Sequence, residues 1–302
     1  MAPETEITPN LIDVKAVFAS KNPRFLKIIP GFIFGIIKSI IHQDKINAHI
    51  YKHRDKFGLP FVSAILGEFS VNIEVVNNTG SVLNPEELAS LIPPQKRYIL
   101  ASNHPLGGLD GLALLHVAGK SRSDVVFPVN DLLMFVPGLK PLFIPINKHG
   151  KNTENVEIIH RTFESDKTIL YFPAGLVSRK QKGGSIVDLE WKKTFITQAK
   201  RYHRDIIPVY ISGRNTSFFY NFANLRKKLK IKGNLEMMLL PDEMMRQKNK
   251  TVRLIFGNPI PWETLDKSHT DREWAEIIKT KVYALETEII SPAPEGVLTL
   301  VT

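Results

Sequence analysis

The sequence contains no cysteine. This absence excludes a disulfide scaffold, a thiolate nucleophile and any metal site that depends on thiolate ligands. The chain also lacks two glycine-rich phosphate loops, G-x-x-x-x-G-K-[ST] and G-x-G-x-x-G, and the G-x-S-x-G turn that carries a serine nucleophile. Its beginning, MAPETEITPNLIDVK, is acidic and polar where a secretory signal is basic and then apolar, so we expect no cleaved signal.

Charge is abundant and mostly positive. The 302 residues include 40 lysines and arginines against 30 aspartates and glutamates, a formal net charge of +10. The surplus lies in two blocks, residues 20–56 with +6 and residues 178–253 with +12, while the rest of the chain is slightly acidic. A basic surplus of this size predicts an anionic partner, which is a nucleic acid, a membrane surface or a phosphorylated molecule.

The most apolar stretch is Phe25–Ile41, FLKIIPGFIFGIIKSII, which lies within the first basic block. At seventeen residues it reaches only the lower limit for a membrane span. We expect an interfacial helix on an anionic membrane surface, and a helix packed on the domain without lipid contact is the alternative. We therefore divide the chain into an N-terminal helical membrane-interface segment, residues 1–68, and an α/β domain with a C-terminal helix, residues 69–302.

From residue 69 onward, apolar runs typical of strands alternate with helical patterns. The expected strands are 69–76, 97–101, 124–129, 142–146, 168–172, 206–211, 235–240 and 252–256, and the expected helices are 85–91, 109–118, 153–165, 188–203, 217–229 and 271–286. This alternation predicts an α/β fold with a mixed, mostly parallel central sheet flanked by helices. Because ligands bind where parallel strands end, we expect the functional residues in the loops after strands 97–101, 168–172 and 206–211.

The first of these loops, residues 103–110, reads NHPLGGLD. A histidine at a strand end and an aspartate at the start of the next helix form a base and its orienting carboxylate. The second imidazole nitrogen is then free to take a proton from a hydroxyl or an amine. The alternative is that His104 is a loop histidine with ordinary hydrogen bonds and that Asp110 only caps the helix.

Further blocks follow this loop in a characteristic order, and together they resemble the glycerolipid (lysophosphatidate-type) acyltransferases. That family carries N-H-x4-D, F-x-x-R, F-P-E-G and V-P-V motifs and a late V-x-x-x-F-G-x-P-I run. The counterparts after the His104 loop are residues 143–148 (FIPINK), 172–175 (FPAG), 207–209 (IPV) and 252–260 (VRLIFGNPI). The Pro-Ala-Gly variant with Ser178, and residues 213–217 (GRNTS), are most similar to the hemolysin-like branch, whose members acylate lyso-ornithine, lyso-glycine and related bacterial aminolipids.

Three positions depart from the family pattern. Five residues separate His104 from Asp110 where the wider family has four, so the pair must close through a longer loop. Ala174 replaces the glutamate, which argues against a glycerol-3-phosphate type of acceptor. Lys148 stands where an arginine usually binds phosphate, and lysine keeps the charge without the bidentate geometry.

The resemblance implies an O-acyltransferase that moves a fatty acyl group from acyl-CoA or acyl carrier protein to the hydroxyl of a lyso-lipid. His104 is then the general base, Asp110 orients it, and no metal or cofactor is required. Backbone amides around 106–108 or 175–176 are candidates for stabilising the oxyanion. The expected partners also include a membrane surface with anionic lipid, at the cytoplasmic face of the inner membrane, and no nucleic acid. The expected substrate-binding residues are Asn103, Lys148, Pro173, Gly175, Ser178, Arg179, Arg214 and Asn215.

Three other readings of the residues remain open. A nucleic-acid-binding module would use the net charge, although the chain shows no zinc-finger spacing and no aromatic-rich basic strand. A metal-dependent hydrolase would use His104, Asp110 and His116. A non-catalytic membrane-surface protein would explain Ala174 and the longer loop between the histidine and the aspartate.

Overall fold

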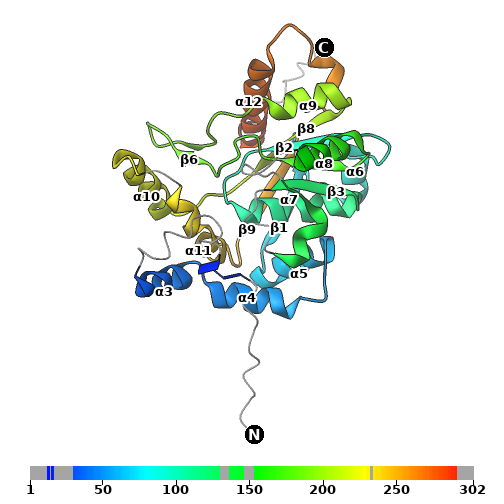
Figure 1. The fold of residues 1–302 in the computed structure, drawn as a ribbon. Helices are drawn as coiled ribbons and strands as arrows, with labels where there is room; N and C mark the ends of the chain where they lie inside the picture. The colour runs from blue at the N-terminus through cyan, green and yellow to red at the C-terminus, as the bar shows by residue number, and fades with distance from the viewer. Residues whose placement is uncertain are drawn as a thin grey trace, which may run out of the picture.

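A seven-stranded sheet forms the centre of the molecule in the computed structural model, which describes residues 12–13, 15–16, 30–129, 136–145, 153–231 and 234–290. The strand order is β1-β9-β8-β2-β5-β3-β4 (Figure 1). Neighbouring strands run parallel except β8 and β9, which are antiparallel. The sheet is therefore mixed and mostly parallel, as the sequence predicted.

The strands lie close to their expected positions, with one exception. They are β1 (Asn72–Asn77), β2 (Tyr98–Ser102), β3 (Val125–Val129), β4 (Phe143–Pro145), β5 (Thr168–Tyr171), β8 (Asp205–Ile211) and β9 (Thr251–Phe256), and β6 (Arg179–Lys180) pairs with β7 (Ile186–Val187) in a small separate hairpin. The strand expected at 235–240 is wrong. This run forms a 3-10 helix, η3 (Leu235–Leu239), followed by α11 (Leu240–Met245). Its apolar residues are leucine and methionine, which favour helices over strands.

The expected helices all form, although α9 starts later than predicted. They are α6 (Pro85–Leu91), α7 (Gly108–Ser121), α8 (Thr153–Glu164), α9 (Thr194–Tyr202), α10 (Ser217–Lys228) and α12 (Asp271–Ile290). Helix α9 begins six residues after the expected start at Asp188 because the intervening residues contact other elements. Asp188 and Trp191 are buried and hydrogen-bonded to each other there.

Helices cover both faces of the sheet, and successive strand residues point to opposite sides. In β2, Leu100 belongs to the core beneath α5, α6 and α7, whereas Ile99 and Ala101 belong to the core beneath α9 and α12. Strands buried on both faces are typical of a sheet between two helical layers. In this three-layer arrangement the helices cover the faces of the sheet, and the functional loops lie at the ends of the strands.

Three helices precede the sheet: α3 (Gly31–Ile40), α4 (Gln43–Lys52) and α5 (Leu59–Phe69). The buried side chains of α5 pack in the same core as β2 and α7, so this core continues across the expected boundary at residue 68. Residues 31–40 of the apolar segment form α3, which buries Phe34 and exposes Phe32, while residues 25–29 lie outside the described part of the chain. No helix within the described residues has both the length and the hydropathy needed to cross a bilayer.

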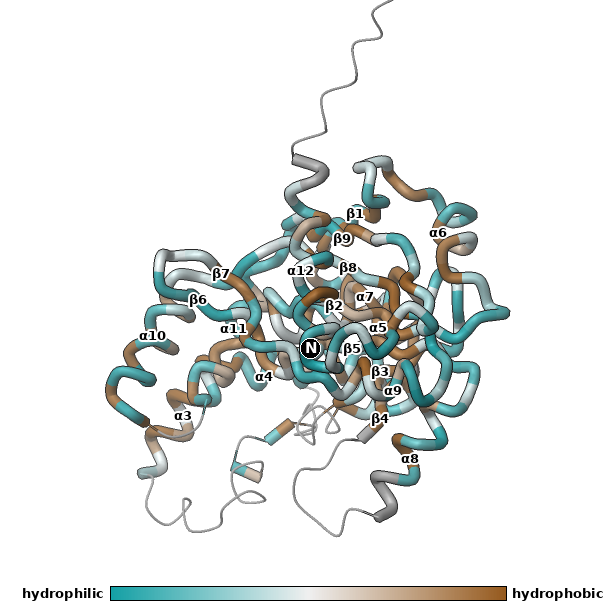
Figure 2. Tube along the Cα trace, turned by 90° about the horizontal axis from the view of Figure 1, so that it is seen from above, coloured by the Kyte–Doolittle hydropathy of each residue, from teal (hydrophilic) through white to brown (hydrophobic). Residues whose placement is uncertain are grey.

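A small lateral layer lies beside the sheet. Helix α10 packs on η3 and β6 around a separate cluster formed by Val177, Phe219 and Tyr220. Helix α3 also contacts η3, and α3 and α10 lie at the same side of the molecule in both views (Figures 1 and 2). This layer continues from the loop after β8, and it therefore borders the carboxyl ends of the strands.

Candidate active site

The three functional loops meet at one edge of the sheet, as predicted. Strand β2 lies between β5 and β8, with Ala101 opposite Tyr171 and Ser102 opposite Val209. Because all three strands run parallel, the residues that follow them emerge together. The loops after β2, β5 and β8 therefore lie side by side.

His104 and Asp110 form a hydrogen-bonded pair. The imidazole Nδ1 lies 2.9 Å from Oδ2 of Asp110, which sits in the first turn of α7. Gly107 in this loop adopts a φ of +87°, which is accessible to glycine at little cost. A side chain at this position would also meet the Leu240 side chain at 3.1 Å. The spacing of five residues is thus compatible with a closed pair.

Asp110 is fully buried and orients the histidine through one carboxylate oxygen. Its Oδ2 also accepts the backbone N–H groups of Leu106 at 2.8 Å and Gly107 at 2.9 Å. Burial raises the pKa of Asp110, and the hydrogen bonds from His104 and the two amides oppose that rise. With the carboxylate accepting the proton on Nδ1, the histidine tautomer presents an unprotonated Nε2.

These hydrogen bonds exclude three of the five backbone amides that the sequence suggested for stabilising an oxyanion. The amides of Leu106 and Gly107 point to Asp110, and the amide of Gly175 donates to the carbonyl of Phe172 at 3.0 Å. These three N–H groups are therefore used within the fold and are not free to stabilise an oxyanion.

The imidazole has an aromatic neighbour on the loop after β5. Its ring stacks on Phe172 with centroids 4.4 Å apart, and Phe127 packs edge-on against Phe172 at 5.3 Å. The His104 side chain is only 17% exposed. The candidate base therefore lies in a largely apolar environment, which strengthens its interaction with Asp110 and limits contact with water.

The backbone of His104 is held by two residues of the β5–α9 connection. Its N–H donates to Oδ1 of Asp188 at 3.2 Å, and its carbonyl accepts the N–H of Ser178 at 2.8 Å. The Ser178 hydroxyl donates to the same Asp188 oxygen, and the Trp191 indole donates to Oδ2 at 2.9 Å. The N–H of Asp188 donates to the hydroxyl of Tyr283 on α12 at 2.8 Å. Asp188 thus connects Ser178, Trp191 and Tyr283 to the peptide of the candidate base.

Sequence reasoning did not find Asp188. The sequence predicts the start of a helix at this residue, where aspartate is common. The signal available in the sequence was an acidic residue three positions before a tryptophan, within a strongly basic segment. Only the folded chain shows that both side chains are buried together.

Most of the other expected binding residues lie near the His104 loop, but their contacts differ from one residue to the next. Asn103 is buried and bridges to β8, accepting from the N–H of Ile211 at 2.7 Å and donating to its carbonyl at 2.9 Å. Asn215 is also buried and donates to the carbonyl of Pro105 at 3.2 Å. Both asparagines therefore hold the loops together. Arg214, next to Asn215, is exposed.

Three further expected residues lie in or after the loop that follows β5. Pro173 accepts the N–H of Lys192 through its carbonyl, and Gly175 adopts a φ of +63°. Arg179 is almost fully buried, and its guanidinium donates to Glu236 at 2.8 Å. Because that contact satisfies its charge inside the lateral layer, Arg179 is not available to a substrate. Lys148 lies outside the described residues.

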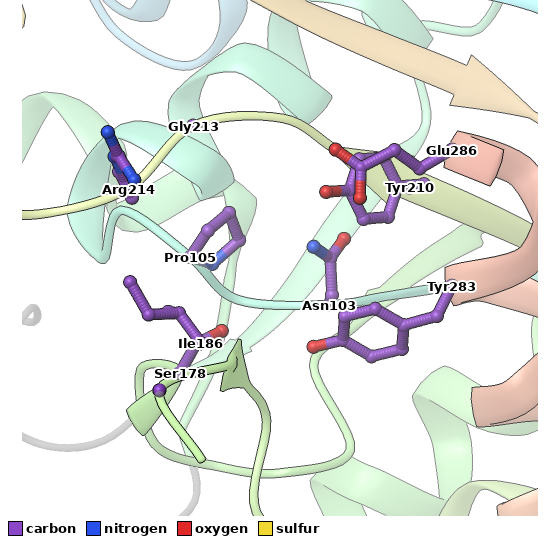
Figure 3. A pocket seen from close by; sticks show the side chains of 10 residues that line it. Asn103, Pro105, Ser178, Ile186, Tyr210, Gly213, Arg214, Tyr283 and Glu286 are labelled. Atoms are coloured by element: carbon purple, nitrogen blue, oxygen red, sulfur yellow. The ribbon is translucent and has the colours of Figure 1, made fainter. Parts of the chain in front are cut away.

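A pocket of about 250 Å³ adjoins the His104 loop (Figure 3). Its lining includes Asn103 and Pro105, the residues on either side of His104, but not His104 itself. Tyr210 and Glu286 lie together on one side of it, and Arg214 lies at another. Burial and then a hydrogen bond to Glu286 raise the pKa of Tyr210, so its hydroxyl stays protonated at neutral pH. The pocket is a polar recess beside the His104–Asp110 pair.

His116 does not join the pair. Its Nδ1 lies 3.0 Å from the hydroxyl of Ser63 on α5, and burial lowers its pKa. Among the residues that the structure describes, no group of three or more histidine, aspartate or glutamate side chains is arranged to hold a metal ion.

The histidine–aspartate pair at the strand ends of the α/β sheet is the arrangement that the resemblance to acyltransferases predicts. Residues 16–291 match the family described as "Acyltransferase", and the chain belongs to this family. The resemblance drawn from the motifs is thereby confirmed, and the protein is an enzyme of the acyltransferase class.

Two relatives are similar to nearly the whole chain. The "Lyso-glycine lipid O-acyltransferase" of Bacteroides thetaiotaomicron is 44% identical over 277 residues, which cover 91% of this chain and 97% of the relative. The protein of the same name from Phocaeicola vulgatus is 42% identical, with 91% and 95% covered. Among solved structures, the 1-acyl-sn-glycerophosphate (LPA) acyltransferase PlsC from Thermotoga maritima is 19% identical with a TM-score of 0.45, covering 84% of this chain and 89% of that one.

Proposed function

We propose that this acyltransferase transfers a fatty acyl group from an acyl thioester to the hydroxyl of a lyso-lipid in bacterial membrane lipid synthesis, and that the acceptor is a lyso-glycine lipid. The observation that carries the reaction is the His104–Asp110 pair at 2.9 Å, set in an apolar environment. The acceptor class is supported by the two relatives of that name, which match nearly their whole length.

In the proposed reaction, His104 acts on the acceptor hydroxyl. Nε2 takes the hydroxyl proton as the oxygen attacks the thioester carbonyl, and Asp110 stabilises the resulting imidazolium. The carbon–sulfur bond then breaks, and the thiolate leaves with the proton from Nε2. An O-ester and a free thiol are the products, and His104 returns to its starting state. No acyl-enzyme intermediate is needed, which is consistent with a chain that has no cysteine and no serine elbow.

The donor is proposed to be acyl-CoA or acyl carrier protein, since both present the acyl group as a thioester. The candidate groups for the anionic parts of donor and acceptor are Arg214, which is exposed beside the pocket, and Lys148. Parallel assays with the two thioesters, at equal acyl chain length, identify the donor by the ratio of their kcat/KM values.

We also propose that the enzyme works on a membrane surface that contains anionic lipid, at the cytoplasmic face of the inner membrane. Helix α3 supports this partner, because Phe32 and Ile36 project into solvent at 69% and 52% exposure from a segment with basic flanks. An acceptor with a long acyl chain resides in such a membrane, so attachment there brings the enzyme to its substrate.

The test of the catalytic proposal is acyl transfer in detergent micelles with thioester, a lyso-glycine lipid and a panel of other lyso-lipids. His104→Ala and Asp110→Asn should each lower kcat by about 10²- to 10⁴-fold, the usual contribution of general base catalysis. In Asp110→Asn the amide oxygen can still accept from His104, Leu106 and Gly107, so the fold should be retained. His269→Ala, remote from the site and packed on Trp274, is the matched control. Full activity in His104→Ala would refute the mechanism, and the absence of any thioester-dependent product would refute the function.

A further inference from the structure

Helix α10 carries two apolar stripes, and only one of them is used inside the protein. Phe219, Tyr220 and Ala223 are buried on η3 and the β6–β7 hairpin. The second stripe repeats at helical spacing on the outside of the helix and consists of Phe218, Phe222, Leu225 and Leu229. Phe218, Leu225 and Leu229 are 65%, 52% and 60% exposed, and Phe218 stacks on Phe222.

Helix α3 lies next to the same 3-10 helix as α10 and carries exposed apolar side chains of its own. Both helices contact η3, whose Leu235 is itself exposed, and the two helices lie at the same side of the molecule in both views (Figures 1 and 2). Phe32, Ile36 and Ile40 of α3 are exposed at i, i+4 and i+8. We call these exposed side chains of α3, η3 and α10 the lateral apolar face.

The charge around the lateral apolar face is positive. Lys227, Lys228 and Lys230 are exposed at the end of α10, beside Leu229. Neither α3 nor α10 contains an aspartate or a glutamate. A second copy of this chain seated here would bring the lysines of both copies together, whereas an anionic bilayer complements both the apolar side chains and the lysines.

The lateral apolar face is also connected to the candidate active site. The loop between β8 and α10 contains Asn215, which donates to the carbonyl of Pro105, the residue that follows His104. An element docked on lipid through α10 therefore adjoins the loop that carries the base.

We propose that α10 is a membrane-docking helix, which inserts its outer apolar stripe into the surface of an anionic bilayer next to α3. This inference rests on the membrane partner of the proposed function and adds a second, distant segment of the chain to the docking surface. Insertion beside the active-site loop positions a bilayer-embedded lyso-lipid for transfer.

The experiment measures binding of the full-length protein to vesicles of phosphatidylcholine with and without phosphatidylglycerol. The double variant Leu225→Ser/Leu229→Ser should bind anionic vesicles about ten- to a hundred-fold more weakly, because each inserted leucine contributes up to about a factor of ten. The matched control is Val82→Ser/Ile158→Ser, which removes two exposed aliphatic side chains away from α3 and α10 and should bind as wild type. The triple change of Lys227, Lys228 and Lys230 to glutamine should weaken binding to anionic vesicles only.

Two further readouts separate this inference from the proposals on which it rests. Activity in detergent micelles should be unchanged in the α10 variants, while activity on acceptor embedded in vesicles should fall with binding. Phe32→Ser/Ile36→Ser tests α3 in parallel. If the α3 variant loses binding and the α10 variant binds as wild type, α10 does not dock. An α10-dependent dimer in sedimentation velocity, with vesicle binding unaltered, would likewise overturn the proposal.

Discussion

The carboxylate of Asp188 accepts the main-chain N–H of His104 at 3.2 Å, across a separation of 84 residues. This contact fixes the backbone of the candidate base, whereas Asp110 fixes its ring. A general base must be held in place relative to the attacking hydroxyl, since small displacements reduce the rate strongly. We infer that Asp188 is a positioning residue that acts through the peptide of His104.

Asp188→Asn should separate this role from a purely structural one. Ser178, Trp191 and the backbone N–H of His104 all donate to the Asp188 carboxylate. The side-chain NH₂ of an asparagine here would therefore meet at least one of these donors, and that hydrogen bond would be lost. The expected result is a decrease in kcat of about ten- to a hundred-fold with little change in KM. The free energy of unfolding should fall by about 1–3 kcal/mol.

The control for Asp188 is Asp166→Asn, where the side chain is 91% exposed and neither effect is expected. A variant of Asp188 that loses stability but keeps its kcat would leave the residue without a positioning role.

Gly107 and Gly108 allow two matched substitutions in the loop that connects His104 to Asp110. Gly107→Ala places a side chain at a φ of +87° and 3.1 Å from Leu240, so it should cost at least about 1–2 kcal/mol of unfolding free energy and reduce kcat as the loop shifts. Gly108 begins α7, and the nearest atom to a Cβ added there would be Sδ of Met244, at 3.9 Å. Gly108→Ala should therefore be neutral or slightly stabilising. Urea unfolding of both variants tests the difference, and equal stability would contradict the role given to Gly107.

The sequence predicted the sheet well because its inner strands are apolar on both faces. Strands β2, β5 and β8 lie within a residue or so of their expected bounds, and the loops that follow them meet as expected. The His104–Asp110 pair is predictable from the sequence because its members are six positions apart and joined by a glycine turn. Local patterns thus sufficed for the strands and for the pair.

Contacts between distant segments were not predicted, because no periodicity reports them. Asp188 contacts His104 and Tyr283 through separations of 84 and 95 residues. The sequence places Arg179 in a glycine-bearing loop and predicts that it binds substrate, yet its side chain is buried and donates to Glu236, 57 residues later. The sequence alone does not distinguish a charged loop side chain that faces solvent from one that faces a buried partner.

Glu68 should make the stability of the protein depend on pH in the acid range. A hydrogen bond from Lys52, followed by one from His53, lowers the pKa of Glu68 from its ordinary 4.5 to about 2. A lowered carboxyl pKa stabilises the fold fully above the ordinary value, and this stabilisation is lost as the pH falls from about 4.5 towards about 2. Lys52 is largely exposed, so solvent screening limits the contribution to about 1 kcal/mol.

The measurement is urea unfolding of wild type and Glu68→Gln at several pH values. The variant should be less stable than wild type at pH near neutrality, and the two curves should converge in strong acid. Glu263→Gln, at an exposed position, is the control and should follow wild type throughout. A constant difference between wild type and Glu68→Gln at every pH would show that the ionised carboxylate does not stabilise the fold.

Arg179 and Arg214 are the two arginines expected to bind substrate, and the structure separates them. Arg179 is buried with Glu236, which Arg226 also contacts at 2.7 Å, whereas Arg214 is exposed beside the pocket. Arg179→Met should lower the unfolding free energy by about 3 kcal/mol, because it leaves part of a buried carboxylate unpaired. The KM of the folded enzyme should stay unchanged. Arg214→Gln should leave stability unchanged and raise the KM of the anionic substrate by about ten-fold, through the loss of a charge-assisted hydrogen bond. Thermal unfolding and steady-state kinetics on both variants decide the assignment, and the reverse pattern would return Arg179 to the binding site.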